Sequence, residues 1–169
     1  GPRAALAVFL GACLHAGAAG SSLARPGGPP RDTLPEDPYR VFARPYDLRV
    51  LEAAQGAGFN VLHVCKNNNH LFALADYPVH AINWAVGAPG NPSLRDVQLN
   101  SDKAVIGGYQ NETLQKGTPA EITVEARLAR EQTGGRRWML GPGCSIAIDG
   151  PEENVRAARA AADNIQTAL

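Results

Sequence analysis

The sequence has no excess of charge of either sign and no long apolar run. Its 169 residues contain 16 Lys and Arg and 16 Asp and Glu, so the formal net charge is zero. Without a basic excess to neutralise phosphate groups, nucleic acid is not an expected partner. No apolar stretch approaches the roughly 18 residues that a membrane-spanning helix needs, so the membrane is not an expected partner either.

Cysteine is also scarce, and several familiar motifs are missing. Three cysteines cannot all pair within the chain and are too few for a disulfide scaffold. The simplest interpretation is a reducing compartment, the cytoplasm, in which the thiols are free for metal binding or chemistry. Neither a Cys-x-x-Cys pair nor a phosphate-binding loop is present. With 44% hydrophobic and 19% charged residues, the composition predicts a single globular domain over residues 1–169.

Residues 1–20 allow two interpretations. Arg3, an apolar run and then small residues are typical of a secretory signal, and in a secreted protein Asn111 would be a glycosylation acceptor. We favour a buried helix over Ala4–His15 that leads into a short strand, because a glycine and a histidine interrupt the apolar run. The chain begins with Gly1 rather than Met, which indicates a processed product or a fragment.

Five short apolar segments, each bounded by turn residues, predict strands. The middle three are near-continuous apolar runs, as expected for strands that are covered on both faces, whereas serines and glycines dilute the first segment. Helical patterns lie between them: one helix begins at Pro45, one follows a capping box of Thr118 and Glu121, and the last begins at Pro151. Arg25–Pro38, rich in proline and glycine, is expected to be a surface loop. The predicted strands are Ala18–Ala24, Phe59–Cys65, Val79–Ala85, Ala104–Tyr109 and Trp138–Ile146.

Strands that alternate with helices predict a parallel sheet and an α/β fold. A closed (β/α)₈ TIM barrel uses about 250 residues, or about 31 for each strand and helix. At that rate a chain of this length supplies about five units, which matches the number of predicted strands. We therefore expect part of a (β/α)₈ barrel. An open, doubly wound sheet of five strands is the alternative.

Two side chains with metal-binding chemistry lie at the end of one predicted strand. His63 and Cys65 are two residues apart, so both project from the same side of the strand. Cys144 lies at the end of the last predicted strand, and the carboxyl ends of parallel strands meet at one edge of the sheet. Imidazole and thiolate groups are zinc ligands, and three protein ligands leave a fourth position open for catalysis. Asn83 and Gln110, near the ends of the next strands, are predicted substrate contacts. From spacing alone, ordinary buried residues remain the alternative.

Other residues with chemical potential are expected to be structural. Cys13 lies in the first apolar segment, where packing explains it. His70 and His80 are expected to face solvent or to support the fold. The pair Gly107–Gly108 is not a phosphate loop and is expected to let backbone approach a ligand.

Six motifs occur in order along the sequence: 16–20 (AGAAG), 44–48 (RPYDL), 59–65 (FNVLHVC), 76–84 (DYPVHAINW), 140–144 (LGPGC) and 151–155 (PEENV). Together they resemble the uroporphyrinogen decarboxylase superfamily. The resemblance covers nearly the whole chain. It corresponds to the C-terminal part of that family's (β/α)₈ TIM barrel, about strands 4–8 with their helices.

The resemblance implies one of two activities. One branch of the superfamily decarboxylates uroporphyrinogen without metal. Its members have a histidine where this sequence has Pro142. They also take site residues from the first half of the barrel, and this sequence does not match that half. The other branch comprises cobalamin-dependent methyltransferases, which bind zinc through a His-x-Cys pair and a distant Cys. His63, Cys65 and Cys144 match all three positions, although Lys66 stands where the family usually has glycine. The methyltransferase branch implies zinc-dependent methyl transfer between a methyl-corrinoid and a thiol.

The expected partners follow from these activities. They are a small-molecule thiol or a tetrapyrrole, and a methyl-corrinoid that is free or carried by a partner protein. An open part of a barrel leaves strand edges unpaired, so self-association or a missing N-terminal half is also expected. Two alternatives remain open. One is a uroporphyrinogen decarboxylase of haem biosynthesis that converts uroporphyrinogen III to coproporphyrinogen III, and the other is a truncated barrel fragment without catalytic activity.

Overall fold

The strands form one parallel sheet whose spatial order, β1-β2-β3-β4-β5, is the same as their order along the chain. The computed structural model of the chain describes residues 2–25 and 40–167. The strands are β1 (Gly20–Arg25), β2 (Phe59–Val64), β3 (Ala81–Trp84), β4 (Ala104–Ile106) and β5 (Trp138–Met139). The helices are α1 (Pro2–His15), α3 (Arg44–Glu52), α4 (Leu71–Leu74), α5 (Leu94–Asn100), α6 (Asn111–Lys116), α7 (Pro119–Thr133) and α8 (Glu152–Thr167).

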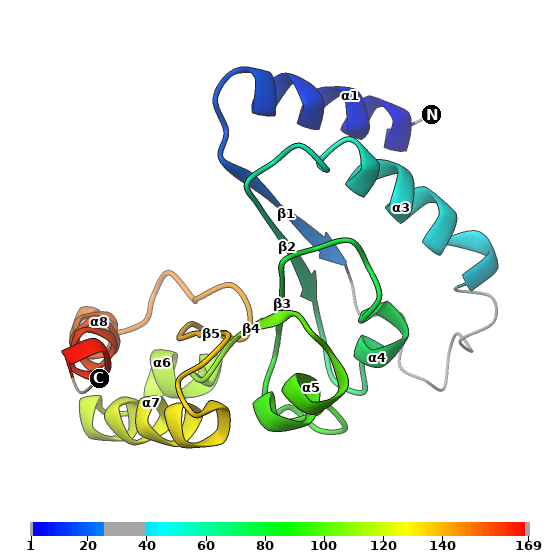
Figure 1. The fold of residues 1–169 in the computed structure, drawn as a ribbon. Coiled ribbons are helices and arrows are strands. Elements are labelled where there is room, and N and C mark those ends of the chain that lie inside the picture. The colour runs from blue at the N-terminus through cyan, green and yellow to red at the C-terminus, as the bar shows by residue number, and fades with distance from the viewer. Residues whose placement is uncertain (1, 26–39, 168–169) are drawn as a thin grey trace.

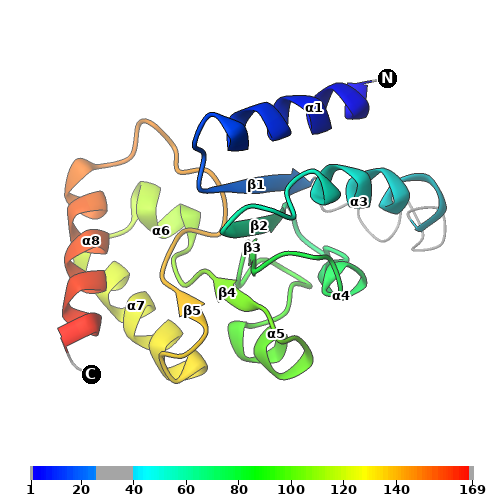
Figure 2. The same ribbon diagram turned by 45° about the horizontal axis from the view of Figure 1, so that its top comes forward.

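This strand order decides between the two predicted architectures. A doubly wound sheet reverses its strand order near the middle, whereas consecutive units of a (β/α)₈ barrel add each new strand beside the last one. The observed order therefore matches the predicted part of a barrel and excludes the doubly wound alternative. The helices are arranged around the sheet, with α1 against α3, α5 against α7 and α7 against α8 (Figures 1 and 2).

The two faces of the sheet differ in burial. One row across the strands faces the helices and belongs to or packs on the main core: Leu23, Leu62, Ile82, Val105 and Trp138. The next row along the strands faces the other way; it is half-buried at His63, Asn83 and Ile106 and exposed at its two ends, Ala24 and Met139. We call this second row the inner row. The prediction that the sheet is covered on both faces is therefore right for one face only. Among the described residues, helices cover the face of the main core and leave the other face partly open.

The structure confirms the residues predicted to begin α3 and to begin and end α7. Pro45 lies in the first turn of α3. Thr118 caps α7 through a complete capping box with Glu121, and Gly134 ends the helix in the left-handed conformation at φ 61°. The predicted loop over Arg25–Pro38 lies outside the described residues, apart from Arg25, which ends β1.

The first helix is correctly predicted as a helix, but the prediction that it is buried is wrong. Leu6, Val8 and Phe9 are 44%, 74% and 67% exposed. The helix has apolar residues on every side, so packing against α3 alone can cover only part of them. No helix in residues 2–25 or 40–167 combines the length and the apolar character needed to cross a membrane.

Three short helices, α4, α5 and α6, were not predicted, and β5 is shorter than predicted. A capping box of Ser93 and Asp96 begins α5 and was the available signal. The strand predicted over Trp138–Ile146 stops at Met139, although a bridge between Tyr109 and Pro142 keeps the next residues beside the segment that follows β4. The glycine- and proline-rich sequence at 141–143 then turns the chain across the end of the sheet.

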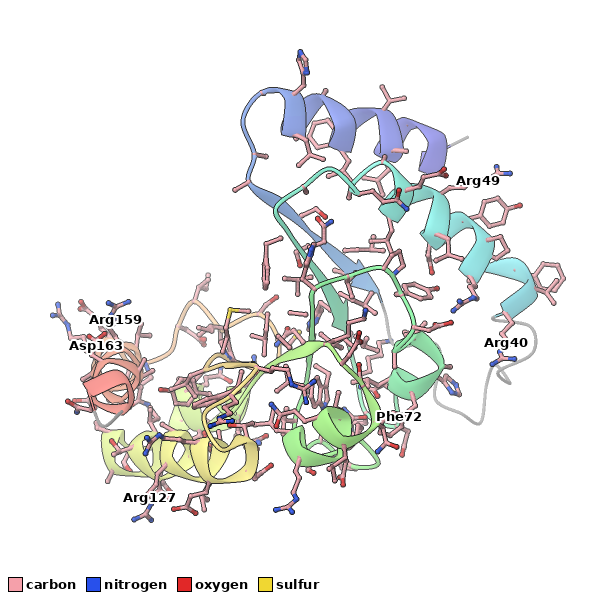
Figure 3. All side chains as sticks on the ribbon, in the orientation of Figure 1. Arg40, Arg49, Phe72, Arg127, Arg159 and Asp163 are labelled. Atoms are coloured by element: carbon pink, nitrogen blue, oxygen red, sulfur yellow. The ribbon has the colours of Figure 1, made fainter. Side chains whose placement is uncertain are left out.

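The outer surfaces of the last two long helices are charged. Arg159 and Asp163 lie together on α8 and form an ion pair at 3.1 Å, and Arg127 points outward from α7 (Figure 3). Such exposed pairs one helical turn apart stabilise a helix only weakly. These faces are therefore ordinary solvated surfaces.

Candidate metal centre

Three side chains from two distant segments converge at the carboxyl end of the sheet. His63 belongs to β2, Cys65 follows its last residue, and Cys144 lies in the segment between β5 and α8. His63 Nε2 lies 2.9 Å from Cys65 Sγ and 3.5 Å from Cys144 Sγ. The two sulfur atoms are 3.8 Å apart. We refer to these three residues as the His-Cys-Cys triad.

The distances and the donor types of the triad fit a tetrahedral metal ion. With Zn–S bonds near 2.3 Å and Zn–N bonds near 2.05 Å, ideal geometry separates two sulfurs by about 3.8 Å and sulfur from nitrogen by about 3.5 Å. The Cys65–Cys144 and Cys144–His63 distances of 3.8 and 3.5 Å match these values. The His63–Cys65 distance of 2.9 Å is shorter, so metal binding would open this contact by about 0.6 Å. One imidazole and two thiols are the donor set that zinc favours.

The strand register places His63 at the site, and a sharp turn follows Cys65. His63 lies in the inner row, directly beside Asn83 of β3. Lys66 then adopts φ 72° in the left-handed region, which bends the chain away from the strand direction. Asn91 holds this turn, because its Nδ2 donates to the carbonyls of Lys66 and Ala85, both at 2.9 Å.

A close backbone approach positions Cys144. A Cβ atom on Gly143 would lie 2.7 Å from the Cα of Ala85, so only glycine lets the chain pass this close to the end of β3. The backbone N–H of Cys144 donates to Asn111 Oδ1 at 3.0 Å, and Asn111 Nδ2 donates to the carbonyl of Ser145 at 2.6 Å. Sequence reasoning missed this role of Asn111 and considered it only as a glycosylation acceptor. Asn111 follows β4 at the carboxyl edge of the sheet, and this position could have predicted a role near the site.

The two predicted substrate contacts both bond to other parts of the protein. Asn83 Oδ1 lies 2.6 Å from His63 Nδ1, and Asn83 Nδ2 donates to the carbonyls of Ile106 and Pro142 at 2.9 and 3.0 Å. Asn83 therefore contacts the triad at the His63 ring nitrogen that does not face the sulfurs. Gln110 Nε2 donates to the carbonyl of Val86 at 2.7 Å. Contact of either residue with a substrate stays a prediction.

The surroundings of Cys65 favour the protonated form of its thiol. Burial raises its pKa, and the neighbouring Cys144 raises it further through a hydrogen bond and the repulsion of a second negative charge. Lys66 opposes these effects with its positive charge. Two thiolates at this distance therefore need a cation between them, which agrees with the metal-binding chemistry of the triad.

The remaining candidates lie outside the triad. Cys13 is a free, half-buried thiol in α1. The exposed His80 supports the fold, because its Nδ1 accepts the Asn60 N–H at 2.8 Å and its ring stacks on Phe59. His70 precedes α4, and no hydrogen-bond partner of its Nε2 is found in the part of the chain that the structure describes.

The glycine pair 107–108 meets protein side chains. A Cβ atom at Gly107 would lie 2.8 Å from the Val86 side chain, and one at Gly108 would lie 2.8 Å from Ala129 and Leu140. These glycines let β4 pack closely on its neighbours. Approach of a ligand to this backbone stays a prediction.

Comparison with known proteins identifies the relatives of this fold. The family model described as uroporphyrinogen decarboxylase (URO-D) matches residues 3–165. A solved structure of a methyltransferase from Methanosarcina mazei superposes with a TM-score of 0.78 and 27% sequence identity. The match covers 97% of this chain and 47% of the methyltransferase, so the chain spans about half the length of that relative. No curated protein matches the chain by sequence.

Proposed function

Because the chain belongs to the uroporphyrinogen decarboxylase family, we propose that it carries the zinc site of an enzyme that transfers a methyl group from a methyl-corrinoid to a thiol. The observation that carries the proposal is the convergence of His63 Nε2 and two cysteine sulfurs, all within 4.8 Å of one another. The similarity to a protein named as a methyltransferase supports this branch of the family. The triad also matches the residues through which the methyltransferase branch is expected to bind zinc.

The chemistry needs a thiol made nucleophilic at neutral pH. Bound zinc would supply this by lowering the pKa of the substrate thiol. The chain would hold the metal with three protein ligands, and all three are only partly buried, so a small substrate can approach them. In the transfer, a carbon–sulfur bond forms and the cobalt–carbon bond breaks, with its electron pair remaining on cobalt. The thiol proton leaves to solvent.

The proposal includes the setting of the reaction. All three cysteines are free in the structure, which suits the reducing conditions of the cytoplasm. The methyl-corrinoid would be a free substrate or a group carried by a partner protein. Since the chain spans about half of the related methyltransferase, metal binding tests the proposal more directly than turnover.

The decisive measurement is the zinc content of the purified protein and of two cysteine variants. We expect about one zinc per chain in the wild type and in Cys13→Ser, whose thiol lies in α1 outside the triad. Cys144→Ser should lose most of the metal, because a serine hydroxyl is a poor zinc ligand. Replacement by Co²⁺ should give sulfur-to-metal charge-transfer bands that Cys144→Ser lacks. Equal zinc content in the wild type and Cys144→Ser would refute the site.

Decarboxylation of uroporphyrinogen is the second candidate, because the matching family model carries that name. The position of the decarboxylases' histidine is Pro142 here, and its carbonyl accepts a hydrogen bond from Asn83 at 3.0 Å. Incubation with uroporphyrinogen III and chromatography of the porphyrins distinguish the candidates. Coproporphyrinogen formation that resists metal chelators would favour decarboxylation over methyl transfer.

A further inference from the structure

One polar side chain touches the triad without belonging to it. Asn83 lies beside His63 in the inner row, and its Oδ1 is 2.6 Å from His63 Nδ1. This is among the shortest side-chain contacts near the triad. The contact involves Nδ1, the imidazole nitrogen that faces away from the two sulfurs.

The other contacts of Asn83 fix which way its amide points. Asn83 Nδ2 donates to the carbonyls of Ile106 and Pro142 at 2.9 and 3.0 Å. Carbonyl oxygens only accept hydrogen bonds, so a flipped amide would set its own oxygen against both of them. The amide oxygen must therefore face His63.

An oxygen that only accepts hydrogen bonds requires a proton on His63 Nδ1. In the neutral imidazole this leaves the lone pair on Nε2, which points toward Cys65 and Cys144 at 2.9 and 3.5 Å. That tautomer is the one that can donate a lone pair to a metal. The opposite tautomer would place an N–H where the ligand atom is needed.

Asn83 also joins the two halves of the triad. Its contact with Pro142 holds the backbone two residues before Cys144, while its contact with His63 holds the ring on β2. One amide thus connects the first and third ligands, which are 81 positions apart in the sequence. The Asn83 side chain is held further by the hydrogen bond that its Nδ2 donates to the carbonyl of Ile106 in β4.

We infer that Asn83 is the positioning residue of the triad: it selects the Nδ1–H tautomer of His63 and fixes the approach of the Cys144 loop. The tautomer part stands on the protein alone, and the part that concerns metal affinity rests on the proposed function.

The tautomer is measured in metal-free protein, independently of any activity. Long-range ¹H–¹⁵N NMR correlations distinguish Nδ1–H from Nε2–H imidazoles, and His63→Gln assigns the signal among the four histidines. At a pH at which His63 is neutral, we expect the Nδ1–H form in the wild type. A mixture of tautomers is expected in Asn83→Ala. An Nε2–H imidazole in the wild type would overturn the inference.

Metal affinity provides the second measurement, by Co²⁺ titration in competition with a chelator. Asn83→Ala should weaken binding by about tenfold to a hundredfold, as loss of a partner behind a metal ligand usually does. The matched control is Asn60→Ala, because Asn60 is a buried amide on β2 that likewise bridges segments, through Ser21 and Ala54.

The outcomes separate the inference from the proposed function. Equal losses in Asn83→Ala and Asn60→Ala, or no loss in Asn83→Ala, would overturn the positioning role. A wild-type protein that binds no metal would refute the proposed function, while the tautomer of metal-free His63 would still test the orienting contact. If Asn83→Ala fails to fold, the tautomer measured in the wild-type protein retains the test.

Discussion

At the scale of single residues, the turn after Cys65 contains a local backbone strain. Lys66 has φ 72°, a left-handed conformation that costs a residue with a Cβ atom about 1–2 kcal/mol relative to the right-handed one. Glycine adopts it freely, which accounts in physical terms for the glycine that the family usually has at this position. The hydrogen bond from Asn91 to the Lys66 carbonyl holds the turn in place.

The strain predicts that Lys66→Gly is more stable than Lys66→Ala. Both variants remove the same charged side chain, so their difference isolates the backbone. We expect Lys66→Gly to exceed Lys66→Ala by about 1 kcal/mol, or about 2–4 °C in Tm for a chain of this size. Thermal and urea denaturation followed by circular dichroism measure this difference. An alanine variant at least as stable as the glycine variant would show that the turn is relaxed.

At the scale of elements, the long helix α7 depends on its first turn. Thr118 and Glu121 form a capping box, in which each side chain accepts a hydrogen bond from the other residue's backbone N–H. The backbone N–H and the hydroxyl of Thr118 both donate to the Glu121 carboxylate and hold its pKa below the ordinary value of 4.5. A carboxyl group with a depressed pKa stabilises the fold above its ordinary pKa, and this contribution is lost as the pH falls through the lowered value.

We predict a pH-dependent cost for Thr118→Ala. Near neutral pH the variant should lose about 1 kcal/mol of unfolding free energy, the usual loss for an N-cap residue. The difference from the wild type should shrink below the ordinary pKa of Glu121, where the carboxylate becomes protonated. Urea denaturation across this pH range measures both effects. The control is Thr123→Ala, a threonine inside the same helix whose hydroxyl donates only to the Pro119 carbonyl, and a similar loss there would contradict the capping explanation.

The segment that carries Cys144 depends on Gly143. An added Cβ would contact the Ala85 Cα at 2.7 Å and the Trp84 carbonyl at 3.1 Å. Both obstacles are backbone atoms at the end of β3, which cannot rotate away. An alanine must therefore push the segment, and Cys144 with it, away from His63.

Gly143→Ala should weaken metal binding by about tenfold or more, because catalytic and ligand geometry must be held within about 0.5 Å. Competition titration with Co²⁺ measures the affinity. Gly56→Ala is the matched control, since a Cβ at Gly56 meets nothing within 4 Å and its backbone needs no positive φ. Wild-type affinity in Gly143→Ala would mean that the segment adapts without moving the ligand.

At the scale of the whole molecule, the described residues form an open sheet. β1 ends it on one side and β5 on the other. The face that carries the inner row also exposes apolar side chains, among them Phe59 at 40% and Met139 at 39%. Unpaired strand edges and exposed apolar surface both favour association with further protein.

We therefore predict that the isolated chain self-associates. Its mass by light scattering after size-exclusion chromatography should rise with protein concentration, because a second copy can cover the apolar face and the β1 edge. Replacing Phe59 by Asp should shift the distribution toward monomer, whereas Phe72→Asp on α4, where the phenylalanine is 48% exposed, should change it less. A compact monomer at all concentrations would contradict the prediction.

The sequence by itself determined the class of fold. Near-continuous apolar runs between helix signals fixed a parallel α/β arrangement, and the capping box of Thr118 fixed the start of α7. The spacing of His63 and Cys65 also placed both side chains on one side of β2, because strand geometry repeats every two residues. Motifs in order identified the family and the portion of its barrel. These are local properties that neighbouring residues decide.

The tertiary structure decided what depends on distant parts of the chain. Burial of α1 and the length of β5 could not be read from local pattern, because both depend on which other elements cover them. The approach of Cys144 to His63 needed the close passage of Gly143 over β3, and the orientation of His63 needed carbonyls from two other segments around Asn83. Hydrogen-bond geometry between residues so far apart is set only when the strands come into register.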